Sequence, residues 1–155
     1  MTTLYLPKHC HQRTVARTGI ILIVHAPLGQ AFRAVVAHID PTAMAQLAVL
    51  DVQPDMSRAE AYEAALALIA SQNCSQYLLM TDLPGLTSPG VVAQNLCAFL
   101  GQRAQLLGGV NMPMLLTALE HLHVDVHRAA LAAQEAGRLG VGGEMSSAAG
   151  CGCAH

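Results

Sequence analysis

Charged side chains are scarce in this chain of 155 residues. Asp, Glu, Lys and Arg together make up 12% of it, about half of the roughly 25% found in an ordinary soluble domain. Aromatic residues amount to 3%, and the formal net charge is −2. A nucleic-acid surface needs clustered basic residues and, for single strands, aromatic side chains on which bases stack. The composition therefore argues against a nucleic-acid partner.

Long hydrophobic runs are also lacking. The apolar run at 19–24 follows Lys8, Arg13 and Arg17, an arrangement that loosely resembles a secretion signal. It has six residues, fewer than the roughly 7–15 of a signal-peptide core and the ~18 of a membrane span. We expect no direct membrane insertion. Because 53% of the residues are nevertheless apolar, we expect a large buried interface, most simply that of a homo-oligomer.

The cysteines do not form an even set. There are five of them: Cys10, Cys74, Cys97, Cys151 and Cys153. An odd number, with Cys74 and Cys97 inside regular elements of the pattern, is typical of reduced thiols and not of a disulfide framework. The sequence therefore predicts a cytoplasmic protein.

What the chain does contain is an alternation of strand-like and helical patterns. Short β-like runs occur at 19–24, 46–52, 76–81 and 104–108. Helical patterns follow them at 28–39, from 57 to about 70, from 88, after Pro113 and at about 125–139. This alternation predicts an α/β fold with an open, mostly parallel four-stranded sheet in the common order 2-1-3-4 and helices on both faces.

Several helix boundaries carry their own signals. Ser57 and Glu60 form a capping-box pattern, and Ser88 before Pro89 predicts that Ser88 caps the next helix. The apolar residues of the first helix recur with helical spacing and predict one continuous buried face. They are Leu28, Ala31, Phe32, Val35, Val36 and Ile39.

The two ends of the chain differ from its middle. Residues 1–17 show no periodicity, and 143–155 are rich in Gly, Ser, Ala and Cys, so we expect one domain at 18–142 between two tails. Cys151, Cys153 and His155 are weak candidates for a metal site, with Cys10 and His11 as further ligands. A single residue between the two cysteines fits poorly with the common zinc spacing, which favours adventitious binding.

Polar residues stand where the first, third and fourth predicted strands end. His25 follows the first, Asp82 the third and Asn111 the fourth. In the order 2-1-3-4 the first and third strands are neighbours, so His25 and Asp82 are expected side by side at the carboxyl edge of the sheet, where ligands bind in such folds. Asn111 is an equally good cap for the helix that follows it.

The residue types at this edge suggest histidine phosphorylation. A neutral imidazole offers a nitrogen lone pair, and a carboxylate on its other nitrogen fixes the tautomer and stabilises the cation that forms. The helix that begins after Pro27 is expected to present free N–H groups as an anion site. No serine or cysteine follows His25 in the tight strand-to-helix turn in which a hydrolase would place its nucleophile.

Three segments carry a family resemblance. "GIILIVHAPLGQAF" (19–32), "LLMTDLPGLTSPG" (78–90) and "GVNMPMLL" (109–116) occur in matching order and spacing. With them the chain resembles, over about 19–142, the IIA domain of the mannose (mannose–fructose–sorbose) family of the bacterial phosphoenolpyruvate:sugar phosphotransferase system. The resemblance implies a phosphotransferase without a cofactor, which takes a phosphoryl group from phospho-HPr and passes it to a IIB partner.

Carried over by position, the resemblance also assigns residues. His25 is the phosphoryl acceptor, Asp82 its hydrogen-bonding carboxylate and Thr87 a hydroxyl beside the phosphate. It further implies a homodimer, with an additional C-terminal antiparallel strand exchanged between subunits. The chain departs from the family pattern at Ala26 and Leu86, where the family has glycine.

Two alternatives stay open at this stage. Phosphorylated His25 serves either sugar transport or a regulatory signal. Alternatively, the chain is a sensing or metal-binding module that kept the fold without phosphotransfer, and Thr87 and Ser88 are explained by helix capping alone.

Overall fold

A computed structural model gives the structure of the protein and describes residues 17–142. Its elements, in chain order, are β1 (Thr18–His25), α1 (Leu28–Ile39), α2 (Pro41–Met44), β2 (Leu47–Val52), α3 (Arg58–Gln72), β3 (Gln76–Thr81), α4 (Ser88–Leu100), the 3-10 turn η1 (Gly101–Arg103), β4 (Ala104–Gly108), α5 (Met112–Glu120) and α6 (Val126–Leu139). The tails predicted at 1–17 and 143–155 lie outside this range except for Arg17.

The sheet has the predicted topology. Its four strands are all parallel and stand in the order β2-β1-β3-β4. In β1 all five residues from Ile20 to Val24 are fully buried. Strands covered on both faces have near-continuous apolar sequences, which explains why this run shows no alternation.

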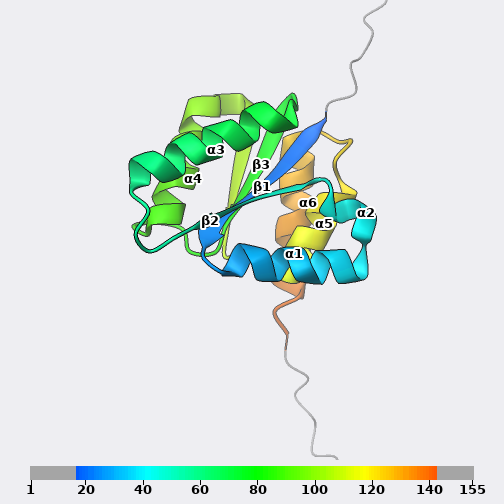
Figure 1. Cartoon of the computed structure of the whole chain (residues 1–155). Helices are drawn as coiled ribbons and strands as arrows, with labels where there is room; N and C mark the ends of the chain where they lie inside the picture. The colour runs from blue at the N-terminus through cyan, green and yellow to red at the C-terminus, as the bar shows by residue number, and fades with distance from the viewer. Residues whose placement is uncertain (1–16, 143–155) are drawn as a thin grey trace, which may run out of the picture.

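Helices cover both faces of the sheet, as predicted (Figure 1). Ile20, Leu22 and Val24 of β1 point into a core closed by α1, α5 and α6. Ile21 and Ile23 point to the opposite face, which α3 and α4 cover. The core is thus split into two layers by the sheet, and β1 contributes to both.

The helix caps confirm one prediction and correct another. Ser57 Oγ accepts from the Glu60 N–H at 3.2 Å while the Glu60 carboxylate accepts from the Ser57 N–H at 2.8 Å, so the capping box is formed. The prediction for Ser88 is wrong, because the extended residue before α4 is Thr87 and Ser88 already belongs to the helix. Pro89 therefore sits at the second helical position, where a missing N–H is equally harmless.

The short helix α2 was not predicted from the pattern. Asp40 caps it, and its Oδ1 accepts from the N–H groups of Thr42 and Ala43 at 2.9 and 3.1 Å. Four residues are too few to show a period, although Asp40 before Pro41 is itself an N-terminal signal.

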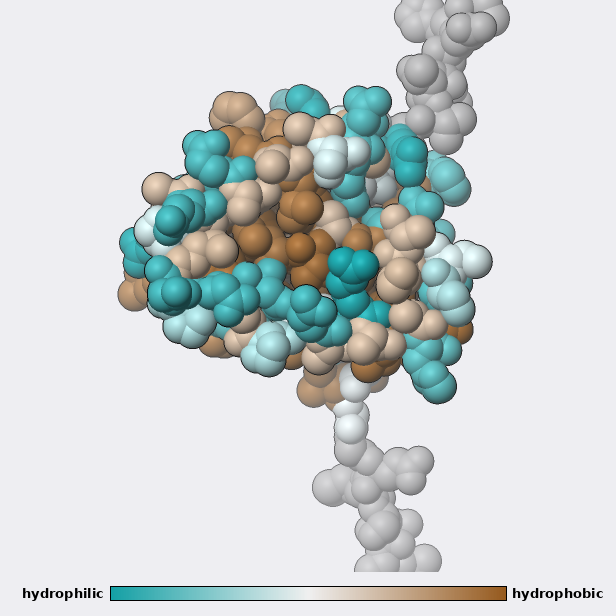
Figure 2. All heavy atoms as spheres, viewed as in Figure 1, coloured by the Kyte–Doolittle hydropathy of each residue, from teal (hydrophilic) through white to brown (hydrophobic). Residues whose placement is uncertain are grey.

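The predicted buried face of α1 is only partly buried. Val36 is fully buried against the sheet, but Leu28, Val35 and Ile39 are 36%, 42% and 54% exposed. The reason is the position of α1 beside β2, which is an edge strand of the sheet. Figure 1 looks onto this edge, and the space-filling view from the same side in Figure 2 shows hydrophilic residues around an apolar hollow between α3 and α1.

The expected exchanged strand is not among the described residues, because within 17–142 no strand follows β4. The chain after Gly142, where such a strand would have to lie, is outside the described range. Within that range no helix combines the length and the apolar character needed to cross a membrane.

Candidate functional site

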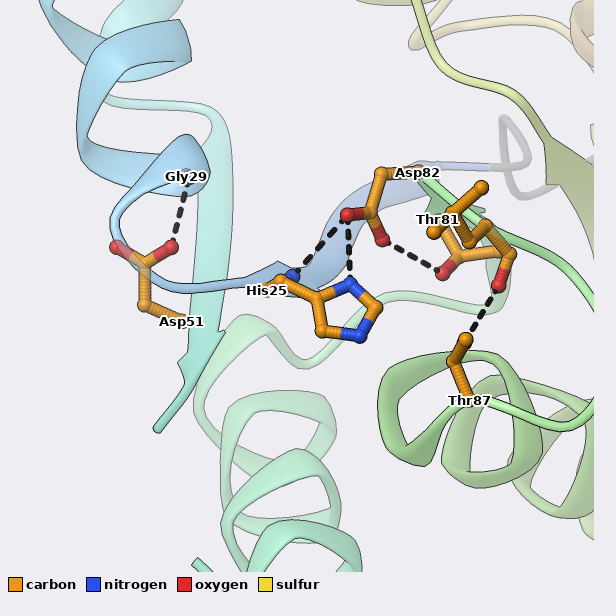
Figure 3. Close-up of polar contacts among 7 residues, drawn as sticks. His25, Gly29, Asp51, Thr81, Asp82 and Thr87 are labelled. Atoms are coloured by element: carbon orange, nitrogen blue, oxygen red, sulfur yellow. Dashed lines mark hydrogen bonds and ion pairs between the residues drawn. The ribbon is translucent and has the colours of Figure 1, made fainter. Parts of the chain in front are cut away.

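His25 and Asp82 meet at the carboxyl edge of the sheet. His25 is the last residue of β1 and Asp82 directly follows β3, the neighbouring strand. The Nδ1 atom of His25 lies 2.7 Å from Asp82 Oδ2, and the His25 backbone N–H donates to the same oxygen at 3.4 Å (Figure 3). The strand order thus brings the two side chains together, as expected from the sequence.

The pair is only partly shielded from water. The His25 side chain is 42% exposed and the Asp82 side chain 14%. Burial acts to raise the pKa of Asp82, but hydrogen bonds from the His25 side chain and from the Leu83 and His25 N–H groups outweigh it, and the pKa is lowered. Asp82 is therefore a carboxylate at neutral pH.

This charge fixes which ring nitrogen carries a proton. A carboxylate can only accept, so Nδ1 of His25 is protonated and donates a hydrogen bond to Asp82. In the neutral ring the second nitrogen, Nε2, then holds the free lone pair, and in Figure 3 it points away from Asp82. The site thus presents one nucleophilic nitrogen, and a carboxylate stands ready to stabilise positive charge on the ring.

The expected anion site at the start of α1 is already filled. Asp51, the penultimate residue of β2, accepts from the Gly29 N–H at 2.7 Å and from the Gln30 N–H at 3.0 Å (Figure 3). A Cβ at Gly29 would come within 2.6 Å of Asp51 Oδ1, so glycine is needed for this contact. Contrary to the prediction, these two N–H groups in the first turn of α1 are therefore not free to bind an anion. In the sequence, the lone aspartate within the apolar pattern of β2 was the signal that could have indicated this contact.

Thr87 lies across the site from Asp82, at the start of α4 (Figure 3). Its hydroxyl donates to the Leu83 carbonyl at 2.9 Å and makes no capping bond. A Cβ on Gly90 would stand 2.5 Å from the same carbonyl oxygen, so the loop after Asp82 packs directly on the first turn of α4. The Ser88 hydroxyl is buried and has no hydrogen-bond partner.

Asn111 has a structural role in the described chain. Its Oδ1 accepts from the Met114 N–H at 3.0 Å, which caps α5, and its Nδ2 donates to the Gly137 carbonyl at 3.0 Å. Of the two roles that the sequence leaves open, the contacts show capping. Asn111 also ties α5 to α6.

No metal site is formed by residues 17–142, where no group of three or more His, Cys, Asp or Glu side chains is placed to hold an ion. Cys74 and Cys97 are free thiols, and burial raises the pKa of both, which makes them poor nucleophiles. The weak metal candidates Cys151, Cys153 and His155 lie outside the described residues.

Comparison with solved structures shows the same fold in phosphotransferase proteins. The phosphotransferase system component EIIA from Streptococcus agalactiae matches with a TM-score of 0.73 and 18% identity over 81% of this chain and 96% of that one. The mannose/sorbose-specific IIA subunit from Enterococcus faecalis matches with a TM-score of 0.70 and 21% identity, over 82% and 94%. A sigma-54 interaction domain protein from Enterococcus faecalis matches with a TM-score of 0.66 and 16% identity, over 83% and 96%.

At these identities the structural matches establish the fold and nothing finer. A search of curated proteins gives no significant match. A family model for the PTS system fructose IIA component, named EIIA-man, matches residues 19–133. This range is more than half of the chain and runs from β1 into α6, so it includes both His25 and Asp82. The chain belongs to this family of phosphotransferase-system IIA components.

Proposed function

We propose that the protein is a phosphocarrier that accepts a phosphoryl group on Nε2 of His25. The donor is phospho-HPr, and the group passes on to a IIB partner or serves as a regulatory signal. The observation that carries the proposal is the 2.7 Å contact between His25 Nδ1 and the Asp82 carboxylate, which leaves Nε2 free. Family membership supports the reaction class.

The transfer is a displacement at phosphorus. The Nε2 lone pair forms the new N–P bond while the N–P bond of the donor histidine breaks, and its electron pair returns to the donor ring. His25 keeps its proton on Nδ1, so the phosphorylated ring is cationic and donates to Asp82. Asp82 stabilises that charge, as the aspartate of a hydrolase triad stabilises its imidazolium. Reversal of the same step on an acceptor protein returns Nε2 to its free state.

In this proposal the first turn of α4 is the part of the site that binds the phosphoryl oxygens. Helix N-termini bind anions through backbone N–H groups that have no acceptor within the helix. We keep Thr87 as the phosphate-proximal hydroxyl of this proposal. Because that hydroxyl donates to the Leu83 carbonyl, it has to rotate before it can donate to a phosphoryl oxygen.

A cytoplasmic homodimer is part of the same proposal. Only 12% of the chain is charged, and large apolar side chains stay at the surface of the described chain. Val35, Ile39 and Phe99 are 42%, 54% and 69% exposed. A second copy of the chain is the simplest partner that covers such side chains.

The second candidate function is regulation without transport. One protein with this fold is named a sigma-54 interaction domain protein, which supports the use of the fold in a signalling context. The same His25 chemistry serves either role, and a chain that never accepts phosphate is the non-catalytic alternative.

The test is phosphorylation by purified enzyme I, HPr and phosphoenolpyruvate, read by mass spectrometry of the intact chain. We expect one acid-labile phosphate per chain in the wild type and none in His25→Ala. His121→Ala is the matched control, because His121 Nδ1 is also fixed at 2.7 Å, but by the Thr117 carbonyl. No added phosphate on the wild type, with phospho-HPr present, would overturn the proposal.

A further inference from the structure

Three exposed leucines stand on the loops that leave the His25–Asp82 pair. Leu83 directly follows Asp82, Leu86 lies further along the same loop, and Leu28 begins the helix after His25. They are 55%, 93% and 36% exposed, respectively. We call these three side chains the apolar rim.

The loop that carries Leu86 packs on the first turn of α4 while Leu86 itself points into solvent. Gly85 before it has a φ of +103°, in the left-handed region that favours glycine. The Gly90 backbone packs against the Leu83 carbonyl, and the Thr87 hydroxyl bonds the same oxygen. Leu86 is 93% exposed, so burial among the described residues does not account for an apolar side chain here, and a partner that covers it gains apolar area.

The two segments that carry the rim contain no charged side chain. The segments 26–32 and 83–102, which leave the ends of β1 and β3, contain no Asp, Glu, Lys or Arg. Asp82 and Asp51 are hydrogen-bonded within the chain, and the exposed charged residues Asp55 and Arg58 stand on the segment that follows β2. On the two rim segments themselves, burial of apolar area is therefore the available means of docking.

A protein donor has to cover this rim. Nε2 of His25 points away from Asp82 on a side chain that is 42% exposed (Figure 3), and transfer requires the reacting atoms to come within about 3–3.5 Å. A phosphohistidine on a protein surface reaches that distance only when the surrounding surface of the donor lies on the loops beside His25. An apolar contact there also excludes water from the transferred group.

We propose that Leu83 and Leu86, together with Leu28 on the segment after His25, bind an apolar patch around the phosphohistidine of the donor protein. This contact, and not charge steering, selects the donor. The inference rests on the proposed phosphorylation of His25 and adds residues that set donor specificity. The family has glycine at the position of Leu86, so this side chain is a feature of the present chain.

The experiment compares a protein donor with a small one. Full-length wild type, Leu83→Ser and Leu86→Ser are phosphorylated with phospho-HPr over a range of concentrations and, separately, with phosphoramidate, which needs no docking surface. The readout is the ratio of the two second-order rate constants. Leu131→Ser on α6 is the control, since Leu131 is 54% exposed, almost the same as Leu83.

We expect each rim substitution to lower the ratio about tenfold, because burying a leucine is worth more than 1 kcal/mol and about 1.4 kcal/mol is tenfold. The loss should appear as a higher half-saturating concentration of phospho-HPr, and Leu131→Ser should leave the ratio unchanged. The wild-type rate should fall less than about threefold when salt rises from 50 to 200 mM, since exposed charges contribute little.

The outcomes separate the two proposals. If the wild type is phosphorylated normally and the rim variants give the same ratio of rate constants as Leu131→Ser, the proposal for the rim is overturned and the proposed function stands. The proposal for the rim is also overturned if the wild-type rate with phospho-HPr falls steeply as salt rises. It is equally overturned if the rim variants lose only the transfer to the IIB acceptor. A wild type that neither phospho-HPr nor phosphoramidate modifies at His25 would overturn the proposed function, and the rim with it.

Discussion

The two edges of the sheet each hold a histidine whose Nδ1 is fixed by a 2.7 Å hydrogen bond. At the carboxyl edge His25 bonds the Asp82 carboxylate, and at the end of α5 His121 bonds the Thr117 carbonyl. Both bonds orient the ring, but only the carboxylate carries the charge that stabilises a cationic ring. The chemistry of the site therefore depends on the type of the acceptor and not on the presence of a hydrogen bond.

Polar side chains at the amino edge of the sheet fasten the chain. Thr18, at the start of β1, is 1% exposed, and its hydroxyl donates to the Val124 carbonyl at 2.8 Å. Tyr77, at the start of β3, donates to the Ile69 carbonyl at 3.0 Å, and Gln76 accepts from the Val126 N–H at 2.9 Å. These three side chains bond to backbone groups, whereas His25 and Asp82 at the carboxyl edge bond to each other and leave Nε2 unused.

The largest effect is expected from Asp82→Asn. An amide supports a cationic ring less well and favours the wrong tautomer, so transfer from phospho-HPr to His25 should slow by up to about 10⁴-fold, the loss seen in a serine-protease triad. Asp51→Asn, which removes the same charge at the same edge, should leave the rate within a few-fold. Stopped-flow phosphotransfer checks both, and an unchanged rate in Asp82→Asn would contradict the role given to this carboxylate.

Thr18→Val should affect stability and leave the chemistry intact. It leaves the part-buried Val124 carbonyl without its donor, which should lower the free energy of unfolding by about 1 kcal/mol. Urea denaturation measures this, and the rate of His25 phosphorylation should stay at the wild-type value. A slower rate in the folded variant would show that the amino edge acts on the site.

Asn111→Ala distinguishes a cap from a residue of the site. Loss of the α5 cap should lower the free energy of unfolding by about 0.5–2 kcal/mol, with no change in the phosphorylation rate. The same urea and stopped-flow measurements apply. A rate loss without a loss of stability would return Asn111 to the carboxyl-edge site.

The smallest effect is a dependence of stability on acid pH. Because the folded-state pKa of Asp82 is lowered, its pairing with His25 stabilises the fold fully above the ordinary aspartate pKa of 3.8 and is lost as pH falls through the lower folded value. The difference in unfolding free energy between wild type and Asp82→Asn should therefore shrink below about pH 4. Denaturant titrations at a series of pH values test this, and a constant difference would contradict the lowered pKa.

Much of the fold was readable because its signals are local. The run 19–24 before His25, the capping box at Ser57 and the strand-end position of Asp82 each depend on few neighbouring residues, and the strand order then brings His25 and Asp82 together. The order itself was expected only because this topology is common, since no local pattern fixes which strands pair.

What the sequence could not show depends on contacts between distant segments. Asp51 fills the start of α1 from another strand, and only the pairing of β1 with β2 reveals it. The exposure of Val35 and Ile39 follows from the position of α1 beside an edge strand, which helical spacing does not record. The shift of the α4 cap from Ser88 to Thr87 depends on how the loop packs against Gly90.

The central claim is that Asp82 holds Nδ1 of His25 and leaves Nε2 as the only acceptor. The most direct measurement is NMR of protein with ¹⁵N-labelled histidine after phosphorylation by phospho-HPr, in which coupling between ³¹P and ¹⁵N identifies the bonded nitrogen. The account predicts coupling to Nε2 of His25 alone, with the proton retained on Nδ1. A phosphoryl group on Nδ1, or on both nitrogens in comparable amounts, would contradict it.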